Sequence, residues 1–475
     1  MKGDIAVVGA GPAGLAAALA AARTGARVIC IDLYPTPGGQ YAMQPGQPDS
    51  AFATTGPVQL GQAAARAATE AGVEIVTGAE VFWGARLDDG RFCLSAQQAG
   101  RGLSIEARAL VVAAGAMERP LPFPGWTLPG VIGAAAAQRM LKTGSGALPL
   151  RDKAVLAGNG AFLMAVAQSF AKAGARLDYL VEMKAPGLRD GAALMLRHPG
   201  RLPEAVDLLT SLRRTGATRH RPHIVTRALG ADHLEAVEIA PLGADGRPDM
   251  SGATVIEGVG TLAIGYGFQP VIDLTTALGA HHDHDPALGG WYCRGGETGE
   301  TSVPGLWAAG ETLGIGGMRP ARLSGQIAGT AAAGSLGFAA KADPAARQQL
   351  RAARRFAADL AALYPVPQSL PIALPGDMPV CRCEDVTVAD INAAVAEGAR
   401  ETMAVKLWTR AGMGPCQGRI CTAGITAALA QAGVPAKAAS YNRAHLPLRP
   451  TPLGIVREAM QAQQELERGA TGKTS

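Results

Sequence analysis

The stretch DIAVVGAGPAGLAAALAAARTGARVICID, residues 4–32, decides the fold of this chain. It reads as a short apolar strand, a glycine-rich turn, an Ala- and Leu-rich helix and a second apolar strand, which together make a βαβ unit. In the turn, Gly9 allows a tight bend, Gly11 lets the backbone approach a pyrophosphate, and Gly14 lets helix and strand pack closely. The spacing predicts a Rossmann-type dinucleotide site whose phosphates meet the N-terminus of the helix.

Three further residues of this unit support a nucleotide ligand. Pro12 falls at the first helical position, where its fixed φ suits the start of a helix, and Ala13 follows it in the same turn. Asp32 ends the second strand, where an acid can accept hydrogen bonds from the hydroxyls of an adenosine ribose. The fingerprint reads only the ADP half of its ligand, so it leaves both FAD and a simple adenine nucleotide open.

A second unit of the same form occupies residues 153–183. It carries Gly158 and Gly160 in its turn and Glu182 at the position of the acid, but Leu163 stands where the third glycine is expected. We expect a Rossmann fold here, while the Leu163 side chain crowds the pyrophosphate position and counts against NAD(P) binding. The two units are roughly 150 residues apart, which indicates one dinucleotide domain inserted in another.

Composition limits the remaining classes of protein. The 475 residues are 48% hydrophobic and 17% charged, with a net charge of +5, which excludes a disordered chain and does not imply a nucleic-acid partner. No apolar run reaches about 18 residues and no signal peptide is recognisable, so we expect no membrane span. The seven cysteines are an odd number without the spread of a disulfide framework, which favours a reducing, cytoplasmic compartment.

Four of these cysteines form one cluster near the C-terminus. They stand as C-x-C in VCRCEDV (380–386) and as C-x4-C in GPCQGRIC (414–421), after a proline-rich stretch at 364–379. Two close pairs of thiolates suit a 2Fe-2S cluster, in which each pair holds one iron. Structural zinc, which more commonly uses C-x2-C knuckles, is the alternative. The predicted metal ligands are Cys381, Cys383, Cys416 and Cys421.

The run from His281 to Asp285 is the other group with possible metal ligands. Consecutive residues of an extended segment point to alternating sides, so only His282 and His284 could converge, and two ligands are too few for a metal site. We expect a solvated loop there. Cys30, which lies in the apolar run before Asp32, is expected to be a small buried hydrophobe.

Residues 1–340 resemble the two-domain flavoprotein disulfide reductase superfamily. The likeness rests on GAGPAG (9–14), PGGQ (37–40), LVVAAGA (110–116) and AAGE (308–311), the last in place of the more usual AGD. The redox disulfide of that superfamily is missing, because no CxxC or CxxxxC lies near either Rossmann unit, and disulfide reduction is therefore disfavoured. The resemblance implies FAD, held by Gly9, Gly11, Pro12, Ala13, Gly14, Asp32, Gly39, Gln40, Val81, Ala114, Gly115, Gly310 and Glu311.

The C-terminal module resembles the 2Fe-2S domains related to bacterioferritin-associated ferredoxin. Two longer strings, ERPLPFPGWTLPGV (118–131) and KLWTRAGMGPCQGRIC (406–421), are similar to the flavin-bearing larger subunit of heteromeric amino-acid and opine dehydrogenases. That family includes D-hydroxyproline dehydrogenase, octopine and nopaline oxidase, and hydrogen cyanide synthase, and the likeness runs from residue 5 to about 455. It implies a D-amino-acid-oxidase-like partner flavoprotein that oxidises the amine, a small ferredoxin-like subunit, FMN at a subunit interface, and a respiratory acceptor at the membrane.

These observations predict an α/β chain with two Rossmann-like domains, one inserted in the other, and a small helical 2Fe-2S domain. The predicted boundaries are 1–117 with 276–340 for the split FAD domain, 118–275 for the inserted domain, 341–379 for a helix and linker, 380–440 for the iron-sulfur domain and 441–475 for a tail.

Flavin exchanges electrons in pairs and 2Fe-2S singly, so we expect an electron-transfer subunit of a dye- or quinone-linked amino-acid or opine dehydrogenase (D-hydroxyproline, proline, octopine, nopaline or glycine type). A freestanding NAD(P)H-dependent flavin oxidoreductase and an adenine-nucleotide-binding scaffold are the alternatives. No residue set in the sequence identifies a catalytic site or a site for an amino-acid carboxylate.

Overall fold

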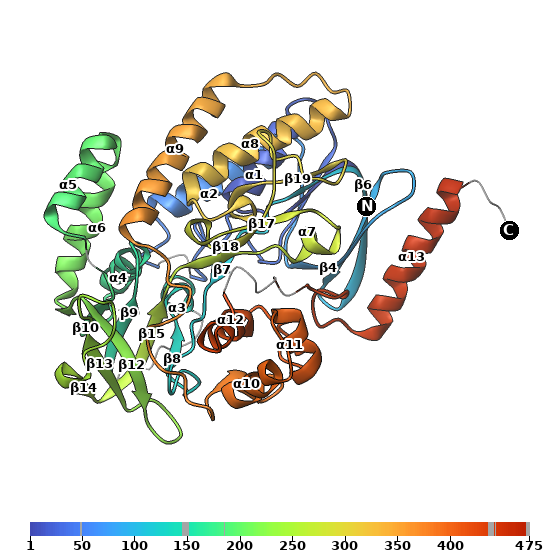
Figure 1. The fold of residues 1–475 in the computed structure, drawn as a ribbon. Helices are drawn as coiled ribbons and strands as arrows, with labels where there is room; N and C mark the ends of the chain where they lie inside the picture. The colour runs from blue at the N-terminus through green and yellow to red at the C-terminus, as the bar shows by residue number, and fades with distance from the viewer. Residues whose placement is uncertain (48–49, 145–151, 185, 436–440, 442, 472–475) are drawn as a thin grey trace.

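A computed structural model describes residues 1–475 except 48–49, 145–151, 185, 436–440, 442 and 472–475. The chain so described packs as two α/β parts and a small helical part that carries the cysteine cluster (Figure 1).

The first α/β part is built on a mixed sheet. In the described residues its strand order is β3-β2-β1-β6-β5-β4, with β19 also paired to β6. The strands β1, β2, β3, β6 and β19 are parallel, β5 pairs antiparallel with β6, and β4 pairs antiparallel with β5. The bounds are β1 Lys2–Val8, β2 Val28–Ile31, β3 Glu74–Val76, β4 Ala79–Arg86, β5 Phe92–Gln98, β6 Arg101–Val112 and β19 Leu306–Ala308, with helices α1 Pro12–Ala22, α2 Gly56–Glu70, α7 Asp273–Ala277 and α8 Met318–Ser335.

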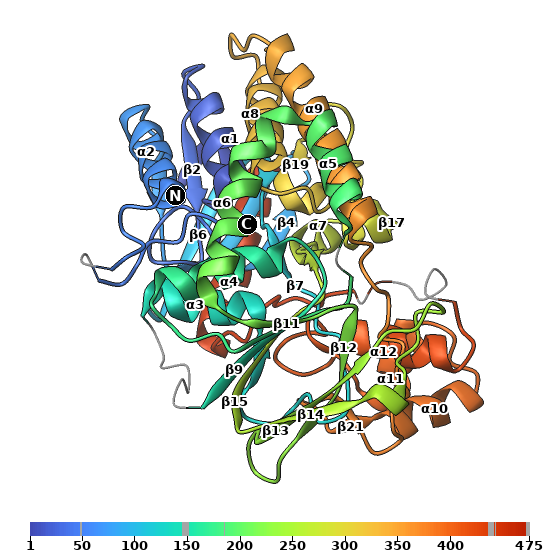
Figure 2. The same cartoon turned by 90° about the vertical axis from the view of Figure 1, so that its left-hand side faces the viewer.

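The helices α1 and α8 lie side by side although some 300 residues separate them in the chain (Figures 1 and 2). Glycines on α8 make this contact possible. A Cβ on Gly325 would lie 2.0 Å from the carbonyl oxygen of Ala13, and a Cβ on Gly329 would lie 2.0 Å from that of Ala17. The backbones therefore touch, and the late segment is held against the helix of the first βαβ unit.

The second α/β part lies within the first in sequence. Its described strands form a parallel sheet in the order β11-β10-β9-β15-β8 and a separate antiparallel sheet, β12-β13-β14. A two-stranded antiparallel ladder, β7 with β16, joins it to the first part. The bounds are β7 Ala116–Glu118, β8 Val131–Gly133, β9 Lys153–Gly158, β10 Tyr179–Glu182, β11 Thr218–His220, β12 His223–Leu229, β13 Ala236–Pro241, β14 Thr254–Glu257, β15 Val259–Gly265 and β16 Phe268–Pro270, with α3 Ala134–Thr143, α4 Phe162–Lys172, α5 Leu188–Arg197 and α6 Leu202–Thr215.

The C-terminal third begins with α9 (Pro344–Leu363), which runs beside α8 in both views (Figures 1 and 2). The chain then crosses the inserted part, where Leu370 is buried in its core, before it enters the cysteine-bearing module. That module comprises the short strands β20 Pro379–Cys381 and β21 Val386–Thr387 and the helices α10 Val388–Ala396, α11 Thr402–Thr409 and α12 Cys421–Gln431.

Two segments differ from the expectations from sequence. The segment expected as a tail contains α13 (Leu453–Thr471), which packs on β5 and β6 and buries Ile455 and Ala459 against Phe82. The run expected as a solvated loop forms β17 (His282–Asp285), which pairs antiparallel with β18 (Gly290–Cys293) and is half-buried. Cross-strand pairing with an aromatic partner, Trp291 opposite His284, stabilises this hairpin.

Candidate flavin and iron-sulfur sites

The glycine-rich turn after β1 has the geometry that the fingerprint predicts. Gly9 adopts φ +102°, and a Cβ there would lie 2.3 Å from the carbonyl oxygen of Ala113. A Cβ on Gly14 would lie 1.6 Å from the carbonyl oxygen of Gly9, so α1 packs directly on the turn. Both positions exclude any side chain, and they place the N-terminus of α1 at the end of the strand.

Gly11 faces a second glycine-rich loop. It is the N-cap of α1, followed by Pro12 at the first helical position, and no side chain caps this terminus. Gly39 of the PGGQ loop lies over it: a Cβ on Gly39 would be 2.9 Å from the Cα of Gly11, while a Cβ on Gly11 would meet only the Cα of Gly39, at 3.8 Å. The free N–H groups of the helix and the absence of side chains leave a narrow approach suited to a pyrophosphate.

Asp32 is fixed at the end of β2. Its side chain accepts hydrogen bonds from the backbone N–H of Ala10 at 2.5 Å and of Tyr34 at 2.7 Å, and the residue is only 5% exposed. Burial raises the pKa of this carboxyl, and the two N–H donors oppose that rise. The backbone of Ala79 at the start of β4 donates to the Asp32 carbonyl at 2.9 Å, which brings the β4 strand, with Val81, to the same edge of the site.

Gly310 and Glu311 reach the same turn from the other end of the sequence. Gly310 has φ +67°, and a Cβ on it would be 2.7 Å from the Cβ of Ala13. The carboxylate of the half-buried Glu311 accepts from the N–H of Gly316 at 3.3 Å and of Gly317 at 2.6 Å, the latter being the N-cap of α8. Burial raises the pKa of Glu311, while these two donors lower it.

The remaining predicted FAD residues surround this core less tightly. Ala114 is partly buried, and Gly115, with φ +79°, has open space where a Cβ would stand. Gln40 is exposed and its Nε2 lies 3.4 Å from the hydroxyl of Tyr34. The structure therefore gathers the predicted residues from six separate stretches of sequence around the N-terminus of α1.

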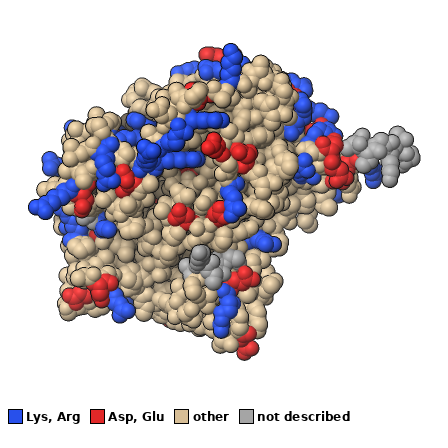
Figure 3. Space-filling view, turned by 45° about the horizontal axis from the view of Figure 1, so that its top comes forward, with Lys and Arg blue, Asp and Glu red and all other residues tan. Residues whose placement is uncertain are grey.

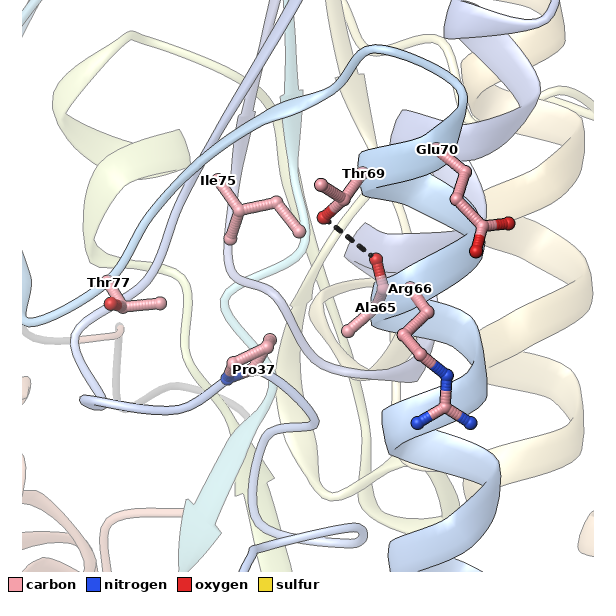
Figure 4. A pocket seen from close by; sticks show the side chains of 7 residues that line it. All are labelled: Pro37, Ala65, Arg66, Thr69, Glu70, Ile75 and Thr77. Carbon is pink, nitrogen blue, oxygen red and sulfur yellow. Dashed lines mark hydrogen bonds between the residues drawn. The ribbon is translucent and has the colours of Figure 1, made fainter.

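A hollow of about 490 Å³ lies outside the group of predicted FAD residues. Its walls are α2 with Ala65, Arg66, Thr69 and Glu70, and the opposing residues Pro37, Ile75 and Thr77 (Figure 4). It borders the PGGQ loop through Pro37 and contains none of the predicted FAD residues.

The four clustered cysteines come together in the C-terminal module. Cys381 and Cys421 are buried, Cys416 is half-buried and Cys383 is exposed. The thiol of Cys421 interacts with both Cys381 and Cys416 and lowers the pKa of each to about 5, while Cys416 also interacts with Cys383. The thiol contacts run from Cys381 to Cys421, from Cys421 to Cys416 and from Cys416 to Cys383, so each of the four thiols contacts at least one other. A two-iron cluster takes two protein ligands on each iron.

Close packing fixes the cysteine-bearing module to its neighbours. A Cβ on Gly414 would lie 2.2 Å from the Cβ of Cys383, so the loop before Cys416 requires glycine there. The indole Nε1 of Trp126, in the inserted part, donates to the carbonyl oxygen of Pro379 at 2.8 Å. Trp126 lies in the string ERPLPFPGWTLPGV that carries the family resemblance, and its hydrogen bond shows that this string contacts the cysteine-bearing module.

The second Rossmann turn differs from the first. Leu163 is buried in the core between α4 and the sheet, with its Cδ2 3.3 Å from where a Cβ on Gly265 would stand. Glu182 is buried and paired with Arg219 at 2.5 Å. The side-chain Nδ2 of Asn159, in the turn itself, donates to the carbonyl oxygen of Pro365 at 2.8 Å, so the linker after α9 lies against this turn.

His282, one of the two half-buried histidines of β17, contacts other side chains of the protein. His282 Nε2 lies 3.0 Å from the hydroxyl of Thr275, and burial lowers the pKa of His282 to about 4. Cys30 is fully buried, as expected.

Charged side chains of both signs lie on the face of the molecule shown in Figure 3, among a larger uncharged area. On the face in Figure 3, Lys and Arg form a band with Asp and Glu beside it, in line with 44 basic and 39 acidic residues. None of the described helices combines the length and the apolar composition that crossing a bilayer requires.

Comparison with known proteins bears out the two kinds of site. Residues 3–198 match the family "Pyridine nucleotide-disulphide oxidoreductase", and residues 379–431 match the family "BFD-like 2Fe-2S binding domain". The second match favours the 2Fe-2S cluster over the zinc alternative.

Two curated relatives are similar over most of their length. An opine oxidase subunit of Agrobacterium tumefaciens (strain Ach5) is 33% identical, with 89% of this chain and 84% of the relative covered. Hydrogen cyanide synthase subunit HcnB of Pseudomonas aeruginosa is 32% identical, with 87% and 90% covered. Among solved structures, L-proline dehydrogenase from P. horikoshii has the same fold, with a TM-score of 0.68 at 20% identity over 96% of this chain and 79% of that one.

These matches confirm the predicted fold class and the two cofactors, FAD and a 2Fe-2S cluster. The chain is an oxidoreductase, a flavin- and iron-sulfur-containing dehydrogenase subunit. It belongs to the family that includes this opine oxidase subunit, together with hydrogen cyanide synthase subunit HcnB.

Proposed function

We propose that this chain is the electron-transfer subunit of a heteromeric, dye- or quinone-linked dehydrogenase that acts on the CH–NH group of an amino acid or opine. The observation that carries the proposal is the union of two redox sites in one packed chain, the fingerprint turn at α1 and the cysteine cluster at α12. Flavin can accept electrons in pairs and 2Fe-2S carries them singly, so the chain converts one mode of transfer into the other.

The residues proposed to hold FAD are those gathered around the N-terminus of α1. Gly9, Gly11 and Gly14 shape the turn for the pyrophosphate, Asp32 fixes the ribose and Glu311 stands at the N-terminus of α8. The proposed cluster ligands are Cys381, Cys383, Cys416 and Cys421, and the exposed Cys383 marks the edge at which a one-electron acceptor can approach.

The partner that we propose is a flavoprotein subunit resembling D-amino-acid oxidase, on which the amine is oxidised. Support comes from the names of the relatives, which are subunits of an opine oxidase and of a hydrogen cyanide synthase. A small ferredoxin-like subunit, together with FMN at the interface between subunits, completes the proposed assembly, which works in the cytoplasm and delivers electrons to a respiratory acceptor. We also propose the domain boundaries predicted from the sequence, with the segment after residue 440 containing the packed helix α13 in place of a tail.

The isolated chain is expected to oxidise no amino acid or opine. Purified holoprotein mixed with D- and L-imino acids, glycine or opines should retain the absorbance of oxidised flavin, and dye reduction should begin only when the partner subunit is present. The reason is that the substrate is oxidised on the partner. Stopped-flow absorbance of the isolated chain and of the copurified complex measures both, and rapid flavin bleaching by an imino acid in the isolated chain would place the catalytic site here instead.

A freestanding NAD(P)H-dependent reductase is the competing function, and three contacts in the second Rossmann turn argue against it. Leu163 fills the position of the third glycine, Arg219 occupies the Glu182 carboxylate, and Asn159 is held by the linker at Pro365. Each removes a feature by which that turn would bind a dinucleotide.

We therefore expect NADH and NADPH to reduce the bound flavin slowly or not at all. Anaerobic stopped-flow mixing at micromolar nucleotide should leave the flavin spectrum unchanged over the time in which dithionite, as the positive control, bleaches it completely. Fast bleaching by either nucleotide would favour the freestanding reductase over the subunit that we propose.

A further inference from the structure

A small cavity of about 100 Å³ lies where the parts of the chain meet. Its lining comes from the β7–β16 ladder, the β17–β18 hairpin, the linker after α9 and the start of α12. Arg119, Gln269, Trp291, Gln368 and Arg419 are the lining residues on which the argument rests.

Arg119 is buried here, and no acidic side chain of the described residues pairs with it. It is 7% exposed, its Nη2 donates to Oε1 of Gln368 at 3.1 Å, and its Nε and Nη1 have no partner in the described part of the chain. Within the same residues, the Nε2 of Gln368 also lacks a partner. The nearby acid, Asp273, is engaged by Arg419 at 2.8 Å and by Arg449 at 3.7 Å. Three buried donor groups on two lining residues, Arg119 and Gln368, thus lack an acceptor in the described structure, and the lining carries one net positive charge.

Burial without an ion pair is costly for a guanidinium. Desolvation lowers the pKa of Arg119 to about 10, so the side chain still carries its charge at neutral pH. Buried charges in proteins are normally paired, and unpartnered buried donors are rare. The pattern is that of a site whose missing component is an anion.

The cavity also lies between the two proposed cofactor sites. On one side, a Cβ on Gly289, a lining residue, would be 2.5 Å from Ile315, in the turn between Glu311 and α8. On the other side, Gln269 Nε2 donates to the carbonyl oxygen of Arg419 at 2.9 Å, and Arg419 Nη1 donates to that of Cys416 at 2.9 Å.

We propose that this cavity binds a small carboxylate, held by the free donors of Arg119 and Gln368. An oxyanion supplies only acceptors, which is what three donor groups require. The cavity of about 100 Å³ has room for a ligand of a few heavy atoms. Trp291, which packs edge-to-face with His284, offers an apolar wall for the rest of a short carboxylic acid. This site is independent of the proposed function and adds to it.

Calorimetric titration of the holoprotein with acetate, at constant ionic strength against chloride, tests the proposal directly. Acetate should bind with about one site per chain and raise Tm, because a ligand that binds only the folded state stabilises it. Arg119→Met should weaken acetate binding by about 10- to 100-fold, and Gln368→Leu by less, since hydrogen bonds from a charged donor are the stronger ones. Arg247→Met, at an exposed arginine of the inserted part, is the matched control and should bind acetate like the wild type.

Unfolding temperatures measured without acetate distinguish a binding role of Arg119 from a structural one. Without acetate, Arg119→Met should unfold at the same or a higher temperature than the wild type, because it removes an unpaired buried charge. A wild-type protein that shows no acetate binding beyond that of chloride would overturn the proposal, whatever the variants do. Binding of inorganic phosphate without binding of acetate would overturn the carboxylate assignment and identify a phosphate group as the ligand.

Discussion

Cys416→Ser is expected to abolish the visible charge-transfer absorption of the iron-sulfur cluster while the flavin absorption remains. In the wild type, iron and acid-labile sulfide should each approach about two per chain. Cys416 contacts both Cys421 and Cys383 through its thiol, so it links the two pairs of proposed ligands and its loss disrupts the set on both sides. Metal and sulfide analysis, together with the absorption spectrum, measures the effect.

The control for this substitution is Cys93→Ser. Cys93 is buried in β5, with its thiol 4.0 Å from the hydroxyl of Ser104 and outside the cysteine-bearing module, so its replacement should leave the cluster intact. If the wild-type protein instead held one zinc ion and no sulfide, the assignment of these four cysteines to a 2Fe-2S cluster would fail.

Gly11→Val is expected to abolish FAD binding rather than weaken it slightly. A Cβ at Gly11 would lie 3.8 Å from the Cα of Gly39, and the two methyl groups of valine would fill this gap between the turn and the PGGQ loop. That gap is where the pyrophosphate must approach the free N–H groups of α1. Flavin content per chain after purification, and titration of the apoprotein with FAD, measure the loss.

Gly191→Val serves as the matched control for a valine in place of a helix-associated glycine. Gly191 lies in α5, has no neighbour within 4 Å of its Cβ position and needs no positive φ, so this variant should keep a full complement of FAD. Normal FAD binding by Gly11→Val would show that the ligand does not cross this turn, and the proposed site residues would have to be reassigned.

The parts of the fold that could be predicted from sequence are those in which local pattern and tertiary role coincide. The first βαβ unit is one of these parts. Gly14 packs on Gly9, and because both residues belong to the motif, the conformation of the turn can be predicted from the motif alone. The paired cysteines are another, because the spacing of the proposed ligands can be seen in two short stretches of sequence, residues 380–386 and 414–421. The distant partners Gly310 and Glu311 follow only from the family resemblance.

What sequence did not predict depends on contacts between remote segments. The helix α13 is mostly exposed and buries only a narrow stripe, Ile455 and Ala459, which is too weak a pattern to stand out in a polar tail. The β17–β18 hairpin has charged and histidine side chains in a strand, and its pairing overrides their low strand propensity. Arg119 is a single arginine in a proline-rich string. The sequence does not show that it is buried, because the cavity that it lines is closed by Gln368 and Arg419, which lie far along the chain.

The way in which the C-terminal chain returns to the first sheet has a consequence for electron flow. After the cysteine module, Leu448 donates to the carbonyl oxygen of Phe82 at 2.7 Å, Arg449 pairs with Glu80 at 3.1 Å, and Trp83 donates to Gln463 on α13 at 3.0 Å. The cysteine-bearing module is therefore held in place on both sides, by the packed linker before it and by these three contacts after it. Because its position is fixed, it cannot carry electrons by moving between partners. The fold sets the distance between the flavin and the cluster, and an outside acceptor has to approach the cluster.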